Sequence, residues 1–293
     1  MNNVIKRATG LLIIEVINSN PNGDPDRESD PRQRPDGRGE ISPVSFKRKL
    51  RDLAEDKEGQ VWKHLEDTLK LKQSKGLDGK TAGFSILESR GRDRKQIEVE
   101  LKNGAFINKY WDGRVFGNTF LEEAMDKATI KTGVVQFGLG LSIAPIEIER
   151  HTNTNKAGVQ EGKNQGMAPM GYRFVPHGVY WMPFFVNPSM AHKSGCTSVD
   201  IDLLKKLIPH AYAHTRSHAR PLVELRHAWY CEHSNPLGSC SDFALIDALK
   251  PKLKKDRDPN KPSKSWDDYE TPTAKDLPSE LSAKIACVDL VNV

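Results

Sequence analysis

The sequence predicts an α+β fold with a ferredoxin-like order of elements, strand–helix–strand–strand–helix–strand, interrupted by insertions. Three observations predict this order. Runs rich in β-branched and other apolar residues mark four long strands, at 9–18, 133–149, 173–187 and 221–234. One capped amphipathic segment follows the first strand, and a second precedes the last of the four. Lysine-rich or glycine-rich stretches separate these elements, as expected of insertions and long loops.

The composition is that of a water-exposed protein with a sizeable core. The 293 residues are 37% hydrophobic and 28% charged, the mean hydropathy is -0.60, and the net charge is +5 with a pI near 8.9. We expect a single domain with insertions over residues 1–293. The modest positive charge suits a protein with one basic groove and an otherwise mixed surface.

Targeting signals are not evident in the sequence. No apolar run approaches the roughly 20 residues that a membrane-spanning helix needs, and the N-terminal MNNVIKRATG lacks the features of a secretory signal. We therefore expect a cytoplasmic protein without a membrane partner. The cysteines have no framework spacing, so we expect reduced thiols. They are Cys196, Cys231, Cys240 and Cys287.

The first strand, TGLLIIEVIN, is apolar on both faces, which is typical of a central strand. Residues 19–39 are rich in Pro, Gly, Asp and Asn and predict a loop. Ser42 is placed to cap the following helix, with Pro43 at its first position. Phe46, Leu50, Leu53 and Ala54 form the apolar stripe of that helix.

The middle of the chain predicts an insertion followed by two strands. Residues 57–105 are lysine-rich; WKHLEDTLKLK is weakly helical and RKQIEVELKNG alternates like an exposed strand. A helix is expected over 119–132. In the strand 133–149, glycines predict a bend or a close backbone approach. Residues 150–172 predict a long flexible loop or an extended hairpin.

The C-terminal part predicts a helix over 198–220, with Asp200 and Asp202 near its positive N-terminal end. A strand and a short helix, SDFALIDAL, follow. Residues 250–275 begin with KPKLKKDRDPNKPSKSW and predict a charged, proline-broken linker. KIACVDLV predicts a last strand.

Acidic residues at alternate positions, from Asp24 to Asp30, suggest a calcium loop at first sight. An EF-hand begun at Asp24 would need Gly and Glu where Ser29 and Pro35 stand, so the pattern fails. Arginines interleave with these acids and can neutralise them. We expect the acids to organise the loop or to meet a neighbouring subunit.

Histidines and cysteines raise two further metal hypotheses. His210, His214 and His218 would share one face of a helix, but the HExxH pattern is absent, and the face could equally contact phosphate. His227, Cys231 and His233 would point to one side of a strand, where a packed thiol beside wet histidines is the simpler interpretation. We find no activated nucleophile, no acid–base pair and no phosphate or dinucleotide loop. We therefore predict no catalytic residue, no metal and no cofactor.

The remaining signal is cationic. Lys47, Arg48, Lys49 and Arg51 crowd one helix directly after the polar loop. A solvated helix face is the usual explanation of such a run. Contacts to a phosphate backbone are the other explanation, because they need these residue types without base-specific spacing.

Six motifs in order resemble the backbone subunit of type I CRISPR surveillance complexes (Cascade), the seventh family of Cas proteins, most closely its type I-C and I-B branch. The first is NPNGDPD with GRGEISPVSFKRKLR. The others are YWDGRVFG, GVVQFGLGLSIAPI, MGYRFVPHGVY, HTRSHAR and CEHSNPLGSCSDFALID. They are distributed along residues 9–249. Departures from the family pattern occur at Pro43–Ser45, Val134, Thr215 and His218, and they bear on the subtype.

The resemblance implies an RRM-like palm with an inserted finger region, residues 60–108, and a thumb, residues 150–171. It implies that several copies form a right-handed helical filament on one CRISPR RNA. Other Cascade subunits and the target DNA strand would be further partners, in antiviral defence. Such a subunit holds RNA by phosphate and ribose without reading sequence, and pairing with the guide supplies recognition.

On this resemblance we expect a set of RNA contacts, with Arg114 and Arg220 as alternative braces of the palm. The set is Asn20, Asn22, Gly23, Lys47, Arg48, Lys49, Arg51, Arg114, Gln136, Arg216 and Arg220. One rival hypothesis is a target-RNA-cleaving subunit, as in type III complexes, with Asp24 or Asp26 as the loop aspartate. Another is a stand-alone RRM module, which would need aromatic-rich strands that are not evident here.

Overall fold

A computed structural model describes residues 4–89, 91, 93–118, 132–156 and 167–292. These residues form an eight-stranded antiparallel sheet in the order β12-β9-β1-β8-β6-β4, with β5 and β7 also paired to β8. The strands of this sheet are β1 (Ala8–Ser19), β4 (Arg38–Ile41), β5 (Val135–Phe137), β6 (Gly140–Pro145), β7 (Glu149–Lys156), β8 (Met167–Val186), β9 (Val223–His233) and β12 (Ile285–Asp289). Two short hairpins pair β2 (Gly23–Asp24) with β3 (Asp30–Pro31) and β10 (Lys252–Leu253) with β11 (Tyr269–Glu270).

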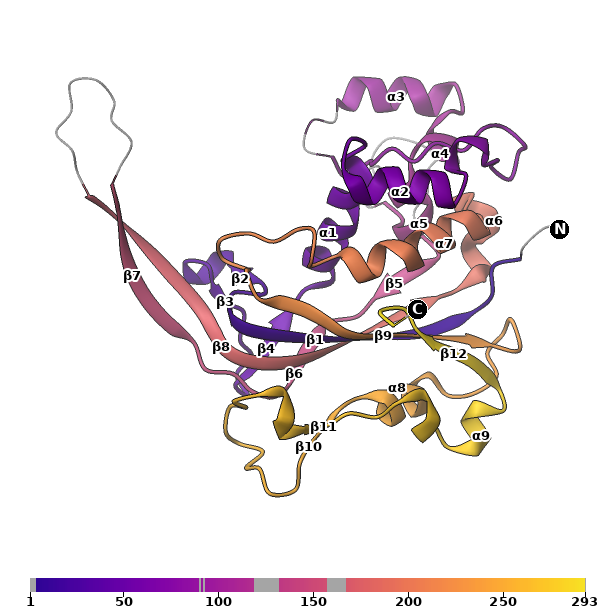
Figure 1. Cartoon of the computed structure of the whole chain (residues 1–293). Helices are drawn as coiled ribbons and strands as arrows, with labels where there is room; N and C mark the ends of the chain where they lie inside the picture. The colour runs from indigo at the N-terminus through magenta and orange to yellow at the C-terminus, as the bar shows by residue number, and fades with distance from the viewer. Residues whose placement is uncertain (1–3, 90, 92, 119–131, 157–166, 293) are drawn as a thin grey trace, which may run out of the picture.

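Helices cover both faces of the sheet (Figure 1). On one face lie α1 (Pro43–Glu55), α2 (Gln60–Thr68), α3 (Arg94–Lys102), α4 (Phe106–Lys109), α5 (Trp111–Phe116), α6 (Ala191–Ser194) and α7 (Ser198–Leu207). On the other face lie α8 (Asp242–Leu249), α9 (Ser279–Ser282) and the β10–β11 hairpin. Within the described part of the chain, no helix has the length and apolar character to cross a membrane. The prediction of an α+β fold is confirmed at this level.

Strand β1 lies inside the sheet, between β9 and β8, as its uninterrupted apolar run predicted. Leu12 and Ile14 pack into a core with α1 and α7, whereas Leu11 and Ile13 pack into a second core with α8. Alternate side chains of a strand point to opposite faces. The continuous apolar run therefore supplies side chains to both cores. A strand with one solvent-exposed face would instead show alternating apolar and polar residues.

Helix α1 begins as its sequence predicted. The Ser42 hydroxyl accepts a hydrogen bond from the Ser45 amide at 3.2 Å, and Pro43 occupies the first turn, where its missing N–H costs nothing. The apolar stripe that contains Phe46 and Leu50 is buried against the sheet. The helix thus starts at the end of the loop that follows β1 and runs across the core.

The predicted strand 133–149 is divided into β5 and β6 at Gly138. The Gly138 amide donates to the Pro183 carbonyl at 2.8 Å, and a Cβ atom there would lie 2.9 Å from the Pro183 ring. Of the two predicted roles of the glycines, the close approach is present, and the strand is interrupted at this point. Beyond β6, the segment 150–172 is a paired hairpin of β7 with β8, one of the two expected forms, and residues 157–166 lie outside the described chain.

Two predicted elements are wrong. RKQIEVELKNG forms helix α3 and not a strand, because its burial has a period of four: Ile97 and Leu101 are 1% and 4% exposed, while Val99 between them is 60% exposed. The helix expected over 198–220 ends at Leu207 and continues only as a 3₁₀ turn to His210, at Pro209. Most of the helix predicted at 119–132 lies outside the described residues.

The C-terminal segment departs from its sequence-based description. Residues 250–275, predicted as a charged linker, fold back against the sheet through the β10–β11 hairpin, with Tyr269 in the second core. The expectation of four reduced thiols is also wrong for two of the cysteines. Cys231 of β9 and Cys287 of β12 stand opposite each other in register and form a disulfide, while Cys196 and Cys240 are free.

Candidate nucleic-acid interface

The C-terminal end of β1 gathers three segments that are far apart in sequence. The Asn20 amide donates to the Ala219 carbonyl at 2.7 Å, and the Leu222 amide donates to the Ser19 hydroxyl at 3.0 Å. The Ser42 amide, at the start of α1, donates to the Asn22 side-chain carbonyl at 2.8 Å. The loop after β1, the first turn of α1 and the chain before β9 therefore form one connected surface.

The acids of this loop are engaged by arginines. Asp30 is buried and accepts hydrogen bonds from Arg150 of β7, while Arg173 of β8 lies 3.4 Å from the same carboxylate. The hydrogen bond from Arg150 is the largest cause that lowers the pKa of Asp30. Asp24 lies 3.8 Å from Arg32. Asp24 thus meets an arginine of the loop itself, as expected, whereas Asp30 is held by arginines outside the loop and ties it to the base of the β7–β8 hairpin.

Lys49 is the unusual cation of α1. It is only 6% exposed, and its ammonium lies 3.5 Å from the Thr215 hydroxyl and 5.1 Å from the centre of the Tyr212 ring. No carboxylate among the described residues lies within 4.0 Å of it. Burial first, and the neighbouring Arg220 second, lower the pKa of Lys49 to about 8. A buried ammonium without a counter-ion is costly and marks a place where an anion is favourable.

Two buried polar atoms of the same surface lack hydrogen-bond partners among the described residues. The Nε of Arg220 and the side-chain oxygen of Asn20 are buried without a hydrogen bond within the described chain. Asn20 uses its Nδ2 to hold the Ser29 carbonyl at 2.8 Å. Buried polar groups are nearly always paired, so a cluster of unpaired ones suits a ligand.

Two of the other predicted cations of α1 already have carboxylate partners. Arg48 pairs with Asp52 and Glu55, at 2.8 Å each. Arg51 is buried and donates from Nε to Asp112 at 2.9 Å. Lys47 lies over the Phe116 ring at 5.2 Å, and burial lowers its pKa.

Arg114 is a structural brace. Its guanidinium donates to both carboxylate oxygens of Asp200, at 3.1 and 2.8 Å, and to the carbonyls of Ile107, Asn108 and Gly83. Both side chains of the pair are at most 2% exposed. Of the two roles considered for Arg114, the structure shows the bracing one, and this places α5 against the N-terminus of α7.

The remaining predicted contacts are dispersed. Gly23 lies in β2, and a Cβ atom there would be 3.2 Å from the Ser29 carbonyl oxygen. Gln136 is exposed on β5, which pairs with β8 beside Thr9, at the opposite end of β1 from Ser19. The structure therefore does not bring Gln136 to the surface that contains Lys49.

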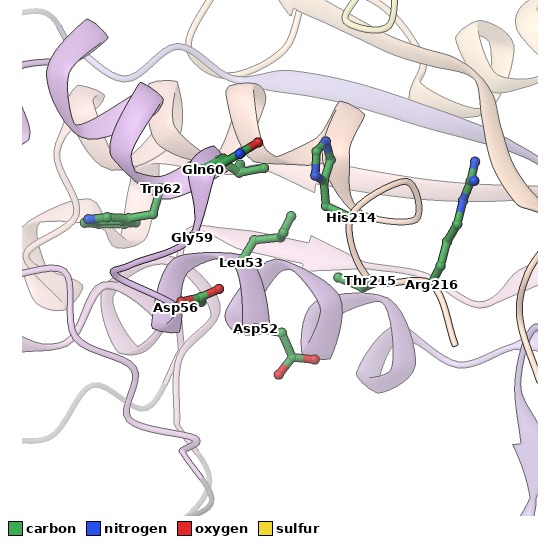
Figure 2. Close-up of a pocket in the computed structure, with 10 residues that line it drawn as sticks. Asp52, Leu53, Asp56, Gly59, Gln60, Trp62, His214, Thr215 and Arg216 are labelled. Carbon is green, nitrogen blue, oxygen red and sulfur yellow. The ribbon is translucent and has the colours of Figure 1, made fainter. Parts of the chain in front are cut away.

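A pocket of about 430 Å³ lies between α1, α2 and the segment 214–216. Figure 2 shows the side chains that line it. Arg216 is exposed at its edge, and Asp52 and Asp56 line its α1 side. Sequence reasoning did not find this pocket, since its walls come from three separate segments. Its lining residues are Asp52, Leu53, Asp56, Gly59, Gln60, Val61, Trp62, His214, Thr215 and Arg216.

The histidine hypotheses do not gain support. His210 and His214 are neighbours, with ring centres 5.3 Å apart, but His218 packs on Tyr172 instead, because no helix carries all three. His227 bonds to Asp289 and His233 contacts the Thr9 hydroxyl. In the part of the chain that the structure describes, no group of three or more His, Cys, Asp or Glu side chains is arranged to hold a metal.

Comparisons with known proteins agree with the family resemblance of the six sequence motifs. The sequence profile of a family described as CRISPR-associated protein Cas7 matches residues 6–274. A curated relative from Haloferax volcanii, also described as CRISPR-associated protein Cas7, is 26% identical over 223 residues, 69% of this chain and 63% of the relative. That match spans less than two thirds of the relative's length.

Solved structures show weaker likeness. A chain of a CRISPR RNA-guided surveillance complex in a pre-nicking state has a TM-score of 0.48 and 13% identity, covering 78% of this chain and 79% of that chain. A chain of the type III-B Cmr-beta complex bound to cognate target RNA has a TM-score of 0.41 and 12% identity, covering 77% of this chain and 61% of that chain.

Proposed function

Because the chain belongs to the CRISPR-associated protein Cas7 family, we propose that it is the RNA-binding backbone subunit of a type I surveillance complex (Cascade). Several copies coat one CRISPR RNA and present its bases for pairing with target DNA. Other Cascade subunits bind the same particle. The protein itself carries out no chemistry.

The observation that carries this proposal is the buried Lys49, whose ammonium has no carboxylate within 4.0 Å among the described residues. Together with Arg220 and the free side-chain oxygen of Asn20, it offers a phosphate and a ribose hydroxyl the partners that the protein does not supply. Lysine is a point charge without a fixed bonding plane, so it holds a phosphate in any sequence context. This matches a subunit that must accept every guide.

The strand order supports an RRM-like palm. Strands β9, β1, β8 and β6 are neighbours in that order, which a βαββαβ unit produces when α1 and α7 are its two crossover helices. An RRM binds RNA on the open face of its sheet, but here α8 and the segment 250–275 cover that face. We therefore assign RNA to the loop end of β1, between the finger region 60–108 and the thumb 150–171.

We divide the predicted contacts by what they already bind. Lys49, Arg216 and Arg220 contact RNA phosphates, and Asn20 contacts ribose. Arg51 and Arg114 are braces, since their guanidinium groups are committed to buried carboxylates. Asn22 and Gly23 shape the loop, and Lys47 and Arg48 lie at the edge of the surface.

Native mass spectrometry with guides of increasing length tests the proposal. We expect a ladder in which the number of bound copies rises with RNA length, as a backbone subunit requires. One copy on every guide length would instead support the stand-alone RRM module. Lys49→Met should weaken the ladder, and the matched control is Lys57→Met, because the pKa of Lys57 is likewise lowered to about 8 while its ammonium is held by the Ala54 and Phe84 carbonyls.

The type III-like nuclease hypothesis has a separate test. Asp24 accepts from the Asp26 amide and faces Arg32, which engages it as a structural group. We expect target RNA paired to the guide to stay intact in magnesium with the wild-type protein. Cleavage that disappears in Asp24→Ala would replace our proposal with the nuclease.

A further inference from the structure

Residues 250–264 carry a net positive charge as large as that of the whole chain. They contain seven Lys and Arg against two Asp, a net charge of +5, which equals the net charge of the whole chain. The other 278 residues are therefore neutral in sum. The cations are Lys250, Lys252, Lys254, Lys255, Arg257, Lys261 and Lys264.

This segment is built into the fold. The buried Asp268 carboxylate accepts from the Lys264 and Ser265 amides, at 2.7 and 3.3 Å, and pairs with Arg257 at 2.9 Å. The Lys264 amide is the main cause that lowers the pKa of Asp268. Ser263 is buried and bonds through its hydroxyl to His177 of β8 at 2.8 Å. These bonds fix the positively charged stretch on the sheet, unlike a solvated tail.

Most of the charge in this stretch is uncompensated. Lys252, Lys255 and Lys264 are exposed, Lys254 is partly exposed, and none of the four has an ion-pair partner among the residues that the structure describes. Figure 1 shows the β10–β11 hairpin and its loop on the face of the sheet opposite to α1. The segment is thus separate from the surface that contains Lys49.

We infer that residues 250–264 form a basic ridge that binds the phosphate backbone of a second polynucleotide, duplex DNA, while the guide occupies the other face. This inference rests on the proposed function. Lysines without base-specific spacing suit phosphate contacts. Protein interfaces need apolar anchors, and none of the exposed large apolar side chains of the described chain lies in the ridge.

The experiment measures duplex DNA binding by the full-length chain across a potassium chloride series. The ridge variant replaces Lys252, Lys254, Lys255 and Lys264 with glutamine. The control variant removes four finger-region charges, at Lys63, Lys72, Lys75 and Lys80, three of which face carboxylates. A labelled duplex of about 30 base pairs gives the slope of log affinity against log salt, which falls by about 0.9 for each lost phosphate contact.

We expect the ridge variant to lose about 3 units of slope, as loss of three or four contacts requires, and the control variant to lose less than about 1. Equal losses in the two variants would overturn the ridge, because the effect would then be one of net charge. An unchanged slope in the ridge variant would overturn it as well. So would binding of anionic phospholipid vesicles that depends on the four lysines when duplex binding does not.

The guide ladder separates this inference from the proposed function. The ridge variant should assemble on guide RNA like the wild type, since its substitutions lie on the far face. Lys49→Met should keep the duplex salt slope. A duplex slope that falls with Lys49→Met as far as with the ridge variant would show one shared surface and overturn the ridge. A missing ladder with a normal ridge effect would refute the proposed function and leave the ridge standing.

Discussion

Replacing Lys49 with methionine should stabilise the free protein while it weakens RNA binding. The pKa of Lys49 is lowered from 10.5 to about 8, mainly by burial. At about 1.4 kcal/mol per pKa unit, holding this ammonium charged at neutral pH costs the folded state up to about 3 kcal/mol. Methionine keeps the apolar stem and removes the charge. The free energy of unfolding should therefore rise by up to about 3 kcal/mol at pH 7.

The pH dependence gives a second readout with a fixed sign. Between pH 8 and 10.5 the unfolded chain binds the Lys49 proton more tightly than the folded chain. Stability of the wild type therefore rises with pH through that window, and Lys49→Met should lack this contribution. Urea unfolding at a series of pH values measures it. The slope of log RNA affinity against log salt should meanwhile fall by about 0.7, the value for one contact to a single strand.

Lys57 provides the matched comparison. Its pKa is also lowered to about 8, but its ammonium donates to two carbonyl oxygens and lies 3.1 Å from the centre of the Trp62 ring. Lys57→Met leaves those carbonyls without a partner, so we expect no gain in stability and no change in the RNA salt slope. The reasoning is refuted if Lys49→Met destabilises the protein and leaves RNA affinity unchanged.

Three further predictions follow from packing and charge. Arg114→Ala should lower the free energy of unfolding by about 3–5 kcal/mol, because it leaves Asp200 charged and buried, and thermal melting measures this loss. Asp30→Asn should loosen the β7–β8 hairpin, seen as faster proteolysis in that hairpin than in the rest of the chain, and acid should do the same as pH falls through the lowered pKa of Asp30. Gly39→Ala should destabilise by about 1–3 kcal/mol, since its Cβ would meet the buried Tyr180 hydroxyl at 2.4 Å.

Where local chemistry decides, the sequence predicted the structure well. The start of α1 follows from Ser42 and Pro43, whose cap and fixed backbone angle act within one turn. The central place of β1 follows from its two-faced apolar run. In both cases the evidence lies within a dozen residues, so no distant contact was needed.

Elsewhere the pattern was ambiguous. In IEVEL, both a strand with a period of two and a helix with a period of about four would bury Ile97 and Leu101. The two differ at Val99, which a strand would bury and which the helix exposes. The packing of residues 250–275 depends on Ser263 and Asp268 reaching partners on the sheet and on their own loop. Composition predicts a solvated linker for such a segment, and nothing local reveals the buried bonds.

The candidate site could be predicted only as a list of cations, because charge is local and its compensation is not. Arg51 finds its carboxylate at Asp112, 61 residues away, and Arg114 finds Asp200, 86 residues away. Lys49 lies on the same helix as Arg51, yet within the described chain it meets a hydroxyl and an aromatic ring instead. A basic residue becomes a candidate for binding phosphate only after the fold has assigned every carboxylate in reach. By that criterion Lys47, Lys49, Arg216 and Arg220 remain within the described chain, and Arg48, Arg51 and Arg114 do not.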